Sequence, residues 1–181
     1  ILEAGHPLPD ENTIAGTQKI TVTYGGKTAN FNVTVTAVTV TSIAIKTTPN
    51  KMSYFVGETL DETGLTLTAT YNNGTTKTIS NGLTCTPTAL NTAGSQKITV
   101  TYSGKTTTFD VNVENIVISS IAVKSNPTKT SYFVGDTLDT SGLTLTATYN
   151  NGTTKTITSG FTCTPTILTT KGTQKTTVVY S

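Results

Sequence analysis

Apolar and polar residues alternate one by one along several short segments of the chain, which is the pattern of half-buried β-strands. In the segment 65–71, LTLTATY, every second side chain is apolar or aromatic and lies on one face of a strand. The segments 97–102 and 105–113 alternate in the same way, and no stretch shows a helical period. We therefore predict an all-β protein, with a core that includes Leu65, Leu67, Ala69, Tyr71, Ile98, Val100, Phe109 and Val111.

Two turn signals join these strands into hairpins. Asn72-Asn73-Gly74 follows the first strand, and Asn-Gly between alternating segments favours a type I′ turn, with a partner strand at 75–79. Ser103-Gly104 connects the other two segments. Shorter strands are expected at 42–45, 54–56 and 83–86. Six or seven short strands in about 75 residues predict an immunoglobulin-like β-sandwich.

The sequence repeats itself at an offset of 120 − 42 = 78 residues. Of the 62 residue pairs between 42–103 and 120–181, 45 are identical, and a fixed period of this kind indicates tandem modules. We expect 1–37 to be the C-terminal part of one unit, 38–116 a complete unit, and 117–181 a unit that lacks its last strand. The second core is then expected at Leu143, Leu145, Ala147, Tyr149 and Val178.

Composition supports the all-β prediction and narrows the class of partner. Threonine supplies 47 of the 181 residues and tryptophan none, and Thr, Val, Ile and Tyr fit a pleated, half-buried surface. The net charge of +2 comes from scattered lysines rather than a basic stripe, which excludes the usual nucleic-acid-binding surface. No segment approaches the roughly 18 to 20 apolar residues of a membrane-spanning helix, and none has the pattern of a signal peptide. We expect a soluble segment that inserts in no membrane, with any export signal or anchor elsewhere.

One long motif occurs twice, at 51–74 and 129–152, with the pattern K-x-x-Y-F-V-G-[ED]-x-L-D-x-x-G-L-x-L-x-A-x-Y-N-N-G. It is followed by G-[ST]-Q-K-x-T-V, and then in the first copy by Y-x-G-K-x-x-x-F-x-V-x-V. Together these motifs resemble the bacterial Ig-like domains of the group 3 type. The resemblance implies a module strung in arrays on secreted and cell-surface proteins of bacteria, where it serves as a spacer, stalk or adhesion element. It implies no catalytic residue.

The residues themselves offer no catalytic machinery. Nucleophilic catalysis needs a base beside the nucleophile, and His6, the only histidine, lies outside the well-matched repeats. The surrounding segment 1–15 contains EAGHPLPDEN, which looks like a short motif of glycerate kinases, although no kinase body accompanies it. A diverged piece of the repeat is the favoured interpretation of this segment, with sequence foreign to the array as the rival. We expect no enzyme activity and no cofactor.

Carboxylates gather before the strand at 65–71: the first copy has Glu58, Asp61 and Glu62, and the second has Asp136 and Asp139. Such a group could hold Ca²⁺, but the loop lacks the ligand density of an EF-hand. The favoured interpretation is that Asp61 and Asp139 accept backbone N–H bonds in the turns that lead to Gly64 and Gly142. We expect no metal site.

Other residues of potential chemistry have ordinary structural interpretations. Cys85 and Cys163 occupy the same place in successive units, and one cysteine per unit cannot close an intersheet bridge. Each is expected to be a small buried hydrophobe, with an interchain disulfide as the alternative. Asn32, Asn73 and Asn151 begin N-glycosylation triplets, but turn geometry already accounts for the last two.

Two functions from different classes fit this sequence. In the first, the modules form a structural stalk or filament at the bacterial cell surface or outside the cell. In the second, they bind a glycan or a host surface protein. Because the chain has no tryptophan and its tyrosines are mostly in phase with core positions, an aromatic sugar-binding platform is not expected, and the structural role is favoured.

The missing last strand of the unit 117–181 leads to a prediction about partners. A sandwich without this strand exposes apolar core and unpaired backbone groups. The segment 25–35, GGKTANFNVTV, is the counterpart of the strand at 103–113. We expect the gap to be filled by adjacent repeats or by another copy of the chain, end to end, and the residues expected to carry this strand complementation are Gly26, Lys27, Phe31, Val33 and Val35.

Overall fold

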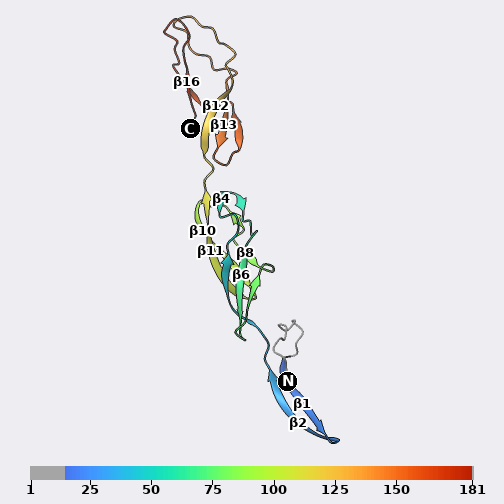
Figure 1. Cartoon of the computed structure of the whole chain (residues 1–181). Coiled ribbons are helices and arrows are strands. Elements are labelled where there is room, and N and C mark those ends of the chain that lie inside the picture. The colour runs from blue at the N-terminus through green and yellow to red at the C-terminus, as the bar shows by residue number, and fades with distance from the viewer. Residues whose placement is uncertain (1–14, 181) are drawn as a thin grey trace. The chain divides into compact units, whose positions relative to one another are not determined.

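The computed structural model describes residues 15–180, and in this range every regular element is a β-strand (Figure 1). The strands fall into three parts along the chain. These are an N-terminal hairpin of β1 and β2, a complete sandwich of β3 to β11, and a C-terminal sandwich of β12 to β16. The all-β immunoglobulin-like architecture expected from the alternating pattern is confirmed.

The complete sandwich has two main sheets. One contains β4 (Ser53–Phe55), β11 (Lys105–Glu114), β10 (Gly94–Tyr102) and β8 (Thr84–Thr86), in that spatial order. The other contains β3 (Val40–Thr47), β6 (Thr66–Tyr71) and β7 (Thr76–Ile79). A small pair, β5 (Glu58–Thr59) with β9 (Ala89–Leu90), was not expected from the sequence. Two-residue strands are too short to show an alternation.

The core of the complete sandwich consists of the side chains that alternate inward on these strands. Of the eight predicted core residues, seven are buried, and Tyr71 is only partly buried. The remaining buried members of the cluster are Tyr54, Leu60, Ile79, Cys85, Leu90 and Val113. The alternating pattern therefore identified most of the core, because on a strand every second residue faces the same side.

The turns differ from the expectation in one place. The turn after β6 is not type I′, which requires positive φ at both central residues, because Asn73 has no positive φ. Gly74 has a φ of 81°, and its N–H donates to the carbonyl of Tyr71 at 3.0 Å, so three loop residues rather than two close this hairpin. The type I′ signature belongs instead to Ser103-Gly104, with φ values of 46° and 72°.

The N-terminal hairpin consists of β1 (Gly16–Tyr24) and β2 (Lys27–Val35), joined by Gly25-Gly26. Its nine antiparallel pairs run from Gly16 opposite Val35 to Tyr24 opposite Lys27. The β10–β11 hairpin has the same register, from Gly94 opposite Val113 to Tyr102 opposite Lys105. The two hairpins are therefore structurally equivalent position by position.

The C-terminal sandwich has fewer paired strands. One sheet contains β12 (Ile118–Ser125), β13 (Thr144–Tyr149) and β14 (Thr154–Ile157), and a second pairs β15 (Thr162–Thr164) with β16 (Thr177–Val179). Its core is smaller. The buried residues are Leu143, Leu145, Ala147, Ile157 and Cys163, while the expected core positions Tyr149 and Val178 are only partly buried.

The chain divides into two compact units, Ile1–Val113 and Glu114–Ser181. The finer boundaries expected at 37/38 and 116/117 stay predictions. Among the described residues, no helix is long and apolar enough to span a membrane.

Candidate functional site

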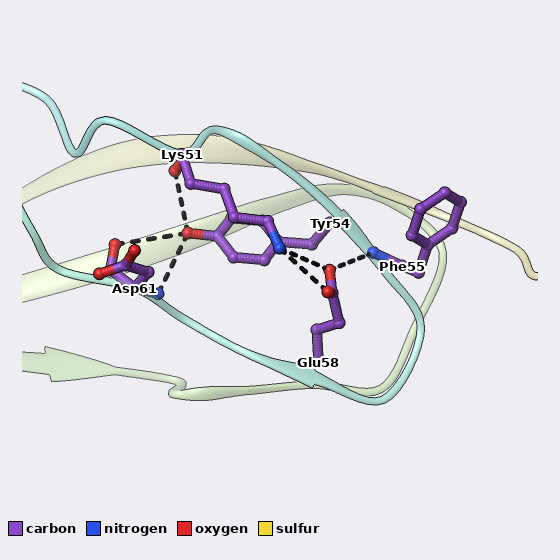
Figure 2. Close-up of polar contacts among 5 residues, drawn as sticks. All are labelled: Lys51, Tyr54, Phe55, Glu58 and Asp61. Carbon is purple, nitrogen blue, oxygen red and sulfur yellow. Dashed lines mark hydrogen bonds and ion pairs between the residues drawn. The ribbon is translucent and has the colours of Figure 1, made fainter. Parts of the chain in front are cut away.

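A loop between β4 and β6 holds the densest set of polar contacts, and it is organised around the hydroxyl of Tyr54 (Figure 2). The Tyr54 side chain is 2% exposed, and its hydroxyl donates to the carbonyl of Lys51 at 2.9 Å. The same oxygen accepts the N–H of Asp61 at 3.1 Å. One phenol therefore ties together backbone groups ten residues apart in the sequence, from Lys51 to Asp61, and closes the loop from inside.

An ion pair covers the outer side of this tyrosine. The Lys51 ammonium lies 4.6 Å from the centre of the Tyr54 ring and contacts both carboxylate oxygens of Glu58 at 3.0 Å. Glu58 also accepts the N–H of Phe55 at 2.8 Å. The Phe55 backbone bond and then the Lys51 ammonium lower the pKa of Glu58. Because both side chains of the pair are partly exposed, its role is to shape the loop rather than to add much stability.

The second carboxylate of the loop is used by the backbone. Asp61 accepts the N–H of Thr63 at 3.0 Å, in the turn that leads to Gly64, as the sequence predicted. Hydrogen bonds from the Thr63 side chain and backbone lower the pKa of Asp61. In the described part of the chain, no group of three or more His, Cys, Asp or Glu side chains is placed to hold a metal ion. The carboxylates whose contacts are defined therefore act as partners of the loop itself.

The C-terminal sandwich builds the same loop with less cover. The Tyr132 hydroxyl donates to Lys129 and accepts from Asp139, at 2.9 and 3.2 Å. Lys129 pairs with Asp136 at 3.4 Å, and Asp139 accepts the N–H of Ser141 at 2.9 Å, as predicted. Backbone hydrogen bonding by Phe133 is the main cause that lowers the pKa of Asp136, and hydrogen bonds from Ser141 lower that of Asp139. Unlike Tyr54, however, Tyr132 is only partly buried.

This difference in burial marks an open edge on the C-terminal sandwich. In the complete sandwich β11 lies between β4 and β10. In the described residues 117–180 no strand occupies the equivalent place, and residues 131–133, which correspond to β4, form no strand. A groove of about 810 Å³ lies there instead. We call it the acceptor groove. The residues of its two sides include Tyr132, Phe133 and Val134 on one and Thr173, Gln174 and Thr176 on the other.

The five residues expected to carry strand complementation all lie on the N-terminal hairpin. Gly26 is in its turn, with a φ of 74°, and Lys27, Phe31, Val33 and Val35 belong to β2. Phe31 is 53% exposed, whereas its equivalent in the complete sandwich, Phe109, is 8% exposed. The hairpin therefore shows solvent the side chains that its equivalent buries. Whether these residues join another unit stays a prediction.

The two cysteines are free and buried, as expected for small core hydrophobes. Burial, and then the nearby carboxylate of Glu62, raise the pKa of the Cys85 thiol to about 12. A thiol with this pKa carries almost no thiolate at neutral pH, so it is a poor nucleophile. His6 and the segment 1–14 lie outside the described residues.

Sequence reasoning missed two roles. It placed Tyr54 on a short strand without identifying its hydroxyl as the centre of a loop, because period-2 patterning reports the face and not the hydrogen bond. It also explained Asn72 only as a turn residue. In the structure Asn72 holds the preceding segment: its side chain accepts the N–H of Thr39 at 3.1 Å and donates to the carbonyl of Ala37 at 2.8 Å. Asn150 does the same for Val117 and Asn115. The only available signal was that both asparagines recur in the repeat.

Paired sheets around a core, an interior tyrosine loop, and no assembled catalytic or metal group among the described residues together define a structural β-sandwich module. The family of bacterial Ig-like domains, group 3, matches residues 10–35, 47–113 and 125–181. The chain belongs to this family. The matched ranges include the N-terminal hairpin and both sandwiches.

Comparisons with individual proteins give partial matches. Pectate lyase L of Thermoclostridium stercorarium is 28% identical over 154 residues, which is 78% of this chain but 12% of the relative. The exo-beta-1,6-galactobiohydrolase of Bifidobacterium longum is 32% identical over 130 residues, which is 67% of this chain and 8% of the relative. A structure of surface layer protein SbsC, domains 4–9, aligns with a TM-score of 0.32 and 21% identity, over 83% of this chain and 27% of that one. The chain thus spans about a tenth of the length of the curated relatives that it matches.

Proposed function

We propose that this chain is a non-catalytic array of structural modules that acts as a spacer or stalk in a larger bacterial protein, outside the cell or at its surface. The observation that carries the proposal is the build of the complete sandwich. It encloses its own core, and the chain enters it at one end, before β3, and leaves it at the other, after β11 (Figure 1). A module of this kind adds length wherever it is inserted.

The two curated relatives support an accessory role. Each matches this chain over a small share of its own length, and each is named for an enzyme activity. Similar modules therefore occupy a minor part of much longer enzymes. The location outside the cell follows from the resemblance of the repeated motif to modules of secreted and surface proteins.

The segments that precede the sandwiches support stiffness. Asn72 fixes residues 37–39 on the hairpin turn of the complete sandwich through two side-chain bonds, and its own N–H donates to the carbonyl of Thr39 at 3.0 Å. A segment bound in this way has little freedom left, since each bonded residue is held in one conformation. Short joints with bound residues limit bending between successive modules.

Small-angle X-ray scattering tests the spacer role. Residues 38–115, one full repeat length, are inserted once and twice more in tandem, and data are extrapolated to zero concentration. A spacer adds the same increment to the maximum dimension with each insertion. Growth in mass with little growth in maximum dimension would contradict the proposal. A version with Asn72→Ala in every inserted unit serves as the control for stiff joints and gives a smaller increment.

Filament formation by strand complementation is the finer part of the proposal. The N-terminal hairpin and the acceptor groove are the two ends that would join. Binding of a glycan or host surface protein stays an untested alternative, and the arrangement of side chains does not favour it over the spacer role.

A further inference from the structure

The resident strand of the C-terminal sandwich is held weakly on the side of the acceptor groove. β16 pairs with β15 over three residues, from Thr162 opposite Val179 to Thr164 opposite Thr177. In the complete sandwich the equivalent β10 is nine residues long and is paired on both sides, with β8 and β11. Residues 172–176, equivalent to the first half of β10, form no strand. A strand with so few ladder bonds is displaced at little cost.

The resident segment also fits its core poorly. The core position that Ile98 holds in the complete sandwich, with 0% exposure, is held here by Thr176. Beside Thr176 lies a cavity of about 160 Å³, whose lining includes Leu143, Cys163 and Val178. A void of this size removes packing contacts from the side chains around it. The site therefore favours a strand with a larger apolar residue at this position.

The N-terminal hairpin is such a strand with its partner already attached. Its Ile20 stands at the equivalent of Ile98 and lies opposite Phe31, as Ile98 lies opposite Phe109. Ile20 is 38% exposed in the described structure. Val22 and Val33, which stand for Val100 and Val111, are also exposed. The hairpin thus presents the inner face of a β10–β11 pair without the rest of a sandwich buried against it.

We propose that the N-terminal hairpin of one copy docks into the C-terminal sandwich of a second copy, displaces residues 172–180, and takes the places that β10 and β11 hold in the complete sandwich. The inference rests on the proposed structural function and adds the interface that joins chains. The exchange breaks the three pairs of β16 and keeps the nine pairs within the hairpin. It places Ile20 at the cavity and a β2 edge beside residues 131–133.

The docking is head to tail, because the hairpin and the groove are different surfaces at different places in the sequence. A heterologous contact of this kind leaves one free hairpin and one free groove at the ends of every assembly, so it grows into a linear filament unless its rotation closes a ring. Insertion of a strand pair into an open sheet edge uses the backbone bonds that the edge leaves unmade. A chain continuation beyond Ser181 that fills the groove would compete with this docking.

Disulfide trapping between two single-cysteine variants tests the register directly. In the complete sandwich Thr101 lies opposite Thr84, and the equivalent residues in the docked pair are Thr23 of the hairpin and Thr162 of the acceptor. Thr23→Cys and Thr162→Cys, made in separate full-length chains of different tagged mass, are mixed and oxidised. A mixed dimer is expected, at least ten-fold above either variant alone. Thr28→Cys replaces Thr23→Cys in the control: Thr28 lies opposite Thr23 on the next strand, too far from Thr162 for a disulfide.

Two further variants separate this docking from other modes of association. Phe31→Asp, on the inner face of the hairpin, is expected to abolish the mixed dimer and the rise in mass with concentration seen by light scattering. Thr176→Ile fits the resident segment to the cavity, so it is expected to lower the yield of mixed dimer several-fold without changing the hairpin. Deletion of 172–181 is expected to raise it.

Each contrary result overturns the inference. These results are a chain that is monomeric at all concentrations, equal trapping by Thr28→Cys, or loss of trapping on deletion of 172–181. The last would mean that β16 pairs with the incoming strand rather than yielding to it. A constant increment in the scattering experiment together with any of these results would leave the spacer role standing and remove only the docking.

Discussion

Removing the Tyr54 hydroxyl measures how much the interior of the loop depends on one buried oxygen. Tyr54→Phe keeps the ring in the core and deletes only the group that donates to Lys51 and accepts from Asp61. The C-terminal sandwich offers a matched control, because Tyr132→Phe deletes the same two bonds, at nearly the same distances, from a ring that is only partly buried.

The expected magnitude follows from burial. A buried donor or acceptor left unpaired costs about 1–3 kcal/mol. Two such groups are left by Tyr54→Phe, but both bonds are only part-buried, so water restores some of the pairing. We therefore expect a loss of about 1–3 kcal/mol in total from the free energy of unfolding of the complete sandwich. At Tyr132 the bonds are exposed and water replaces the hydroxyl, so the loss should stay below about 0.5 kcal/mol.

Hydrogen exchange of the full chain, read by mass spectrometry, reports the two sandwiches separately through the amides of β6 and β13. Because 1.4 kcal/mol corresponds to a tenfold change in an equilibrium constant, Tyr54→Phe should speed exchange in β6 by roughly 5- to 150-fold. Exchange in β13 should not change. Tyr132→Phe should speed β13 by less than about threefold.

Equal effects of the two substitutions would refute the reasoning, since the hydrogen bonds are the same and only burial differs. A larger effect at Tyr132 would refute it more strongly. Unchanged exchange in β6 after Tyr54→Phe would show that the hydroxyl contributes nothing net to the complete sandwich.

Three other predictions follow from the same loop. Bonds to Glu58 and Asp61 lower both pKa values, so the stability that they add is present above their unfolded values, 4.5 and 3.8, and is lost as the pH falls below them; a thermal melt series from pH 6 to pH 2 shows this, and Glu58→Gln should flatten it. Gly64 has a φ of 90°, and an added Cβ would lie 2.5 Å from the Asn50 side chain, so Gly64→Ala should destabilise by about 1–3 kcal/mol in urea, with the smaller loss in Gly74→Ala, at a φ of 81° in open space, as control. A chelator should leave the melting temperature unchanged, because the carboxylates already bond to the loop; a fall of several degrees would reveal a bound cation.

The sequence determined the strands of the complete sandwich and most of its core, because alternation alone sets which side chains share a face. The strand expected at 65–71 is β6, and the hairpin expected around Ser103-Gly104 is β10 with β11. The role expected for Asp61 and Asp139 in their turns is also confirmed, since a short carboxylate reaches an N–H two residues ahead.

The turn after β6 was beyond sequence reasoning. Asn-Gly is compatible with both a two-residue and a three-residue loop, and the choice depends on how the two strands pair. Tyr71 bonds to Thr75 across the loop, which fixes three residues between them. The clamp formed by Asn72 was hidden for the same reason, since its partners lie more than thirty residues earlier in the chain.

The clearest division between the two levels is the segment S-Y-F-V-G, which occurs at 53–57 and again at 131–135. The first copy forms β4 and buries Tyr54, while the second forms no strand and leaves Phe133 86% exposed. Identical residues therefore have different structures. The sequence determined which side chains could face a core and which loop bonds form, because these are local. The tertiary structure decided whether the segment became a strand, because a strand needs a neighbour for its backbone groups, and only the first copy lies beside β11.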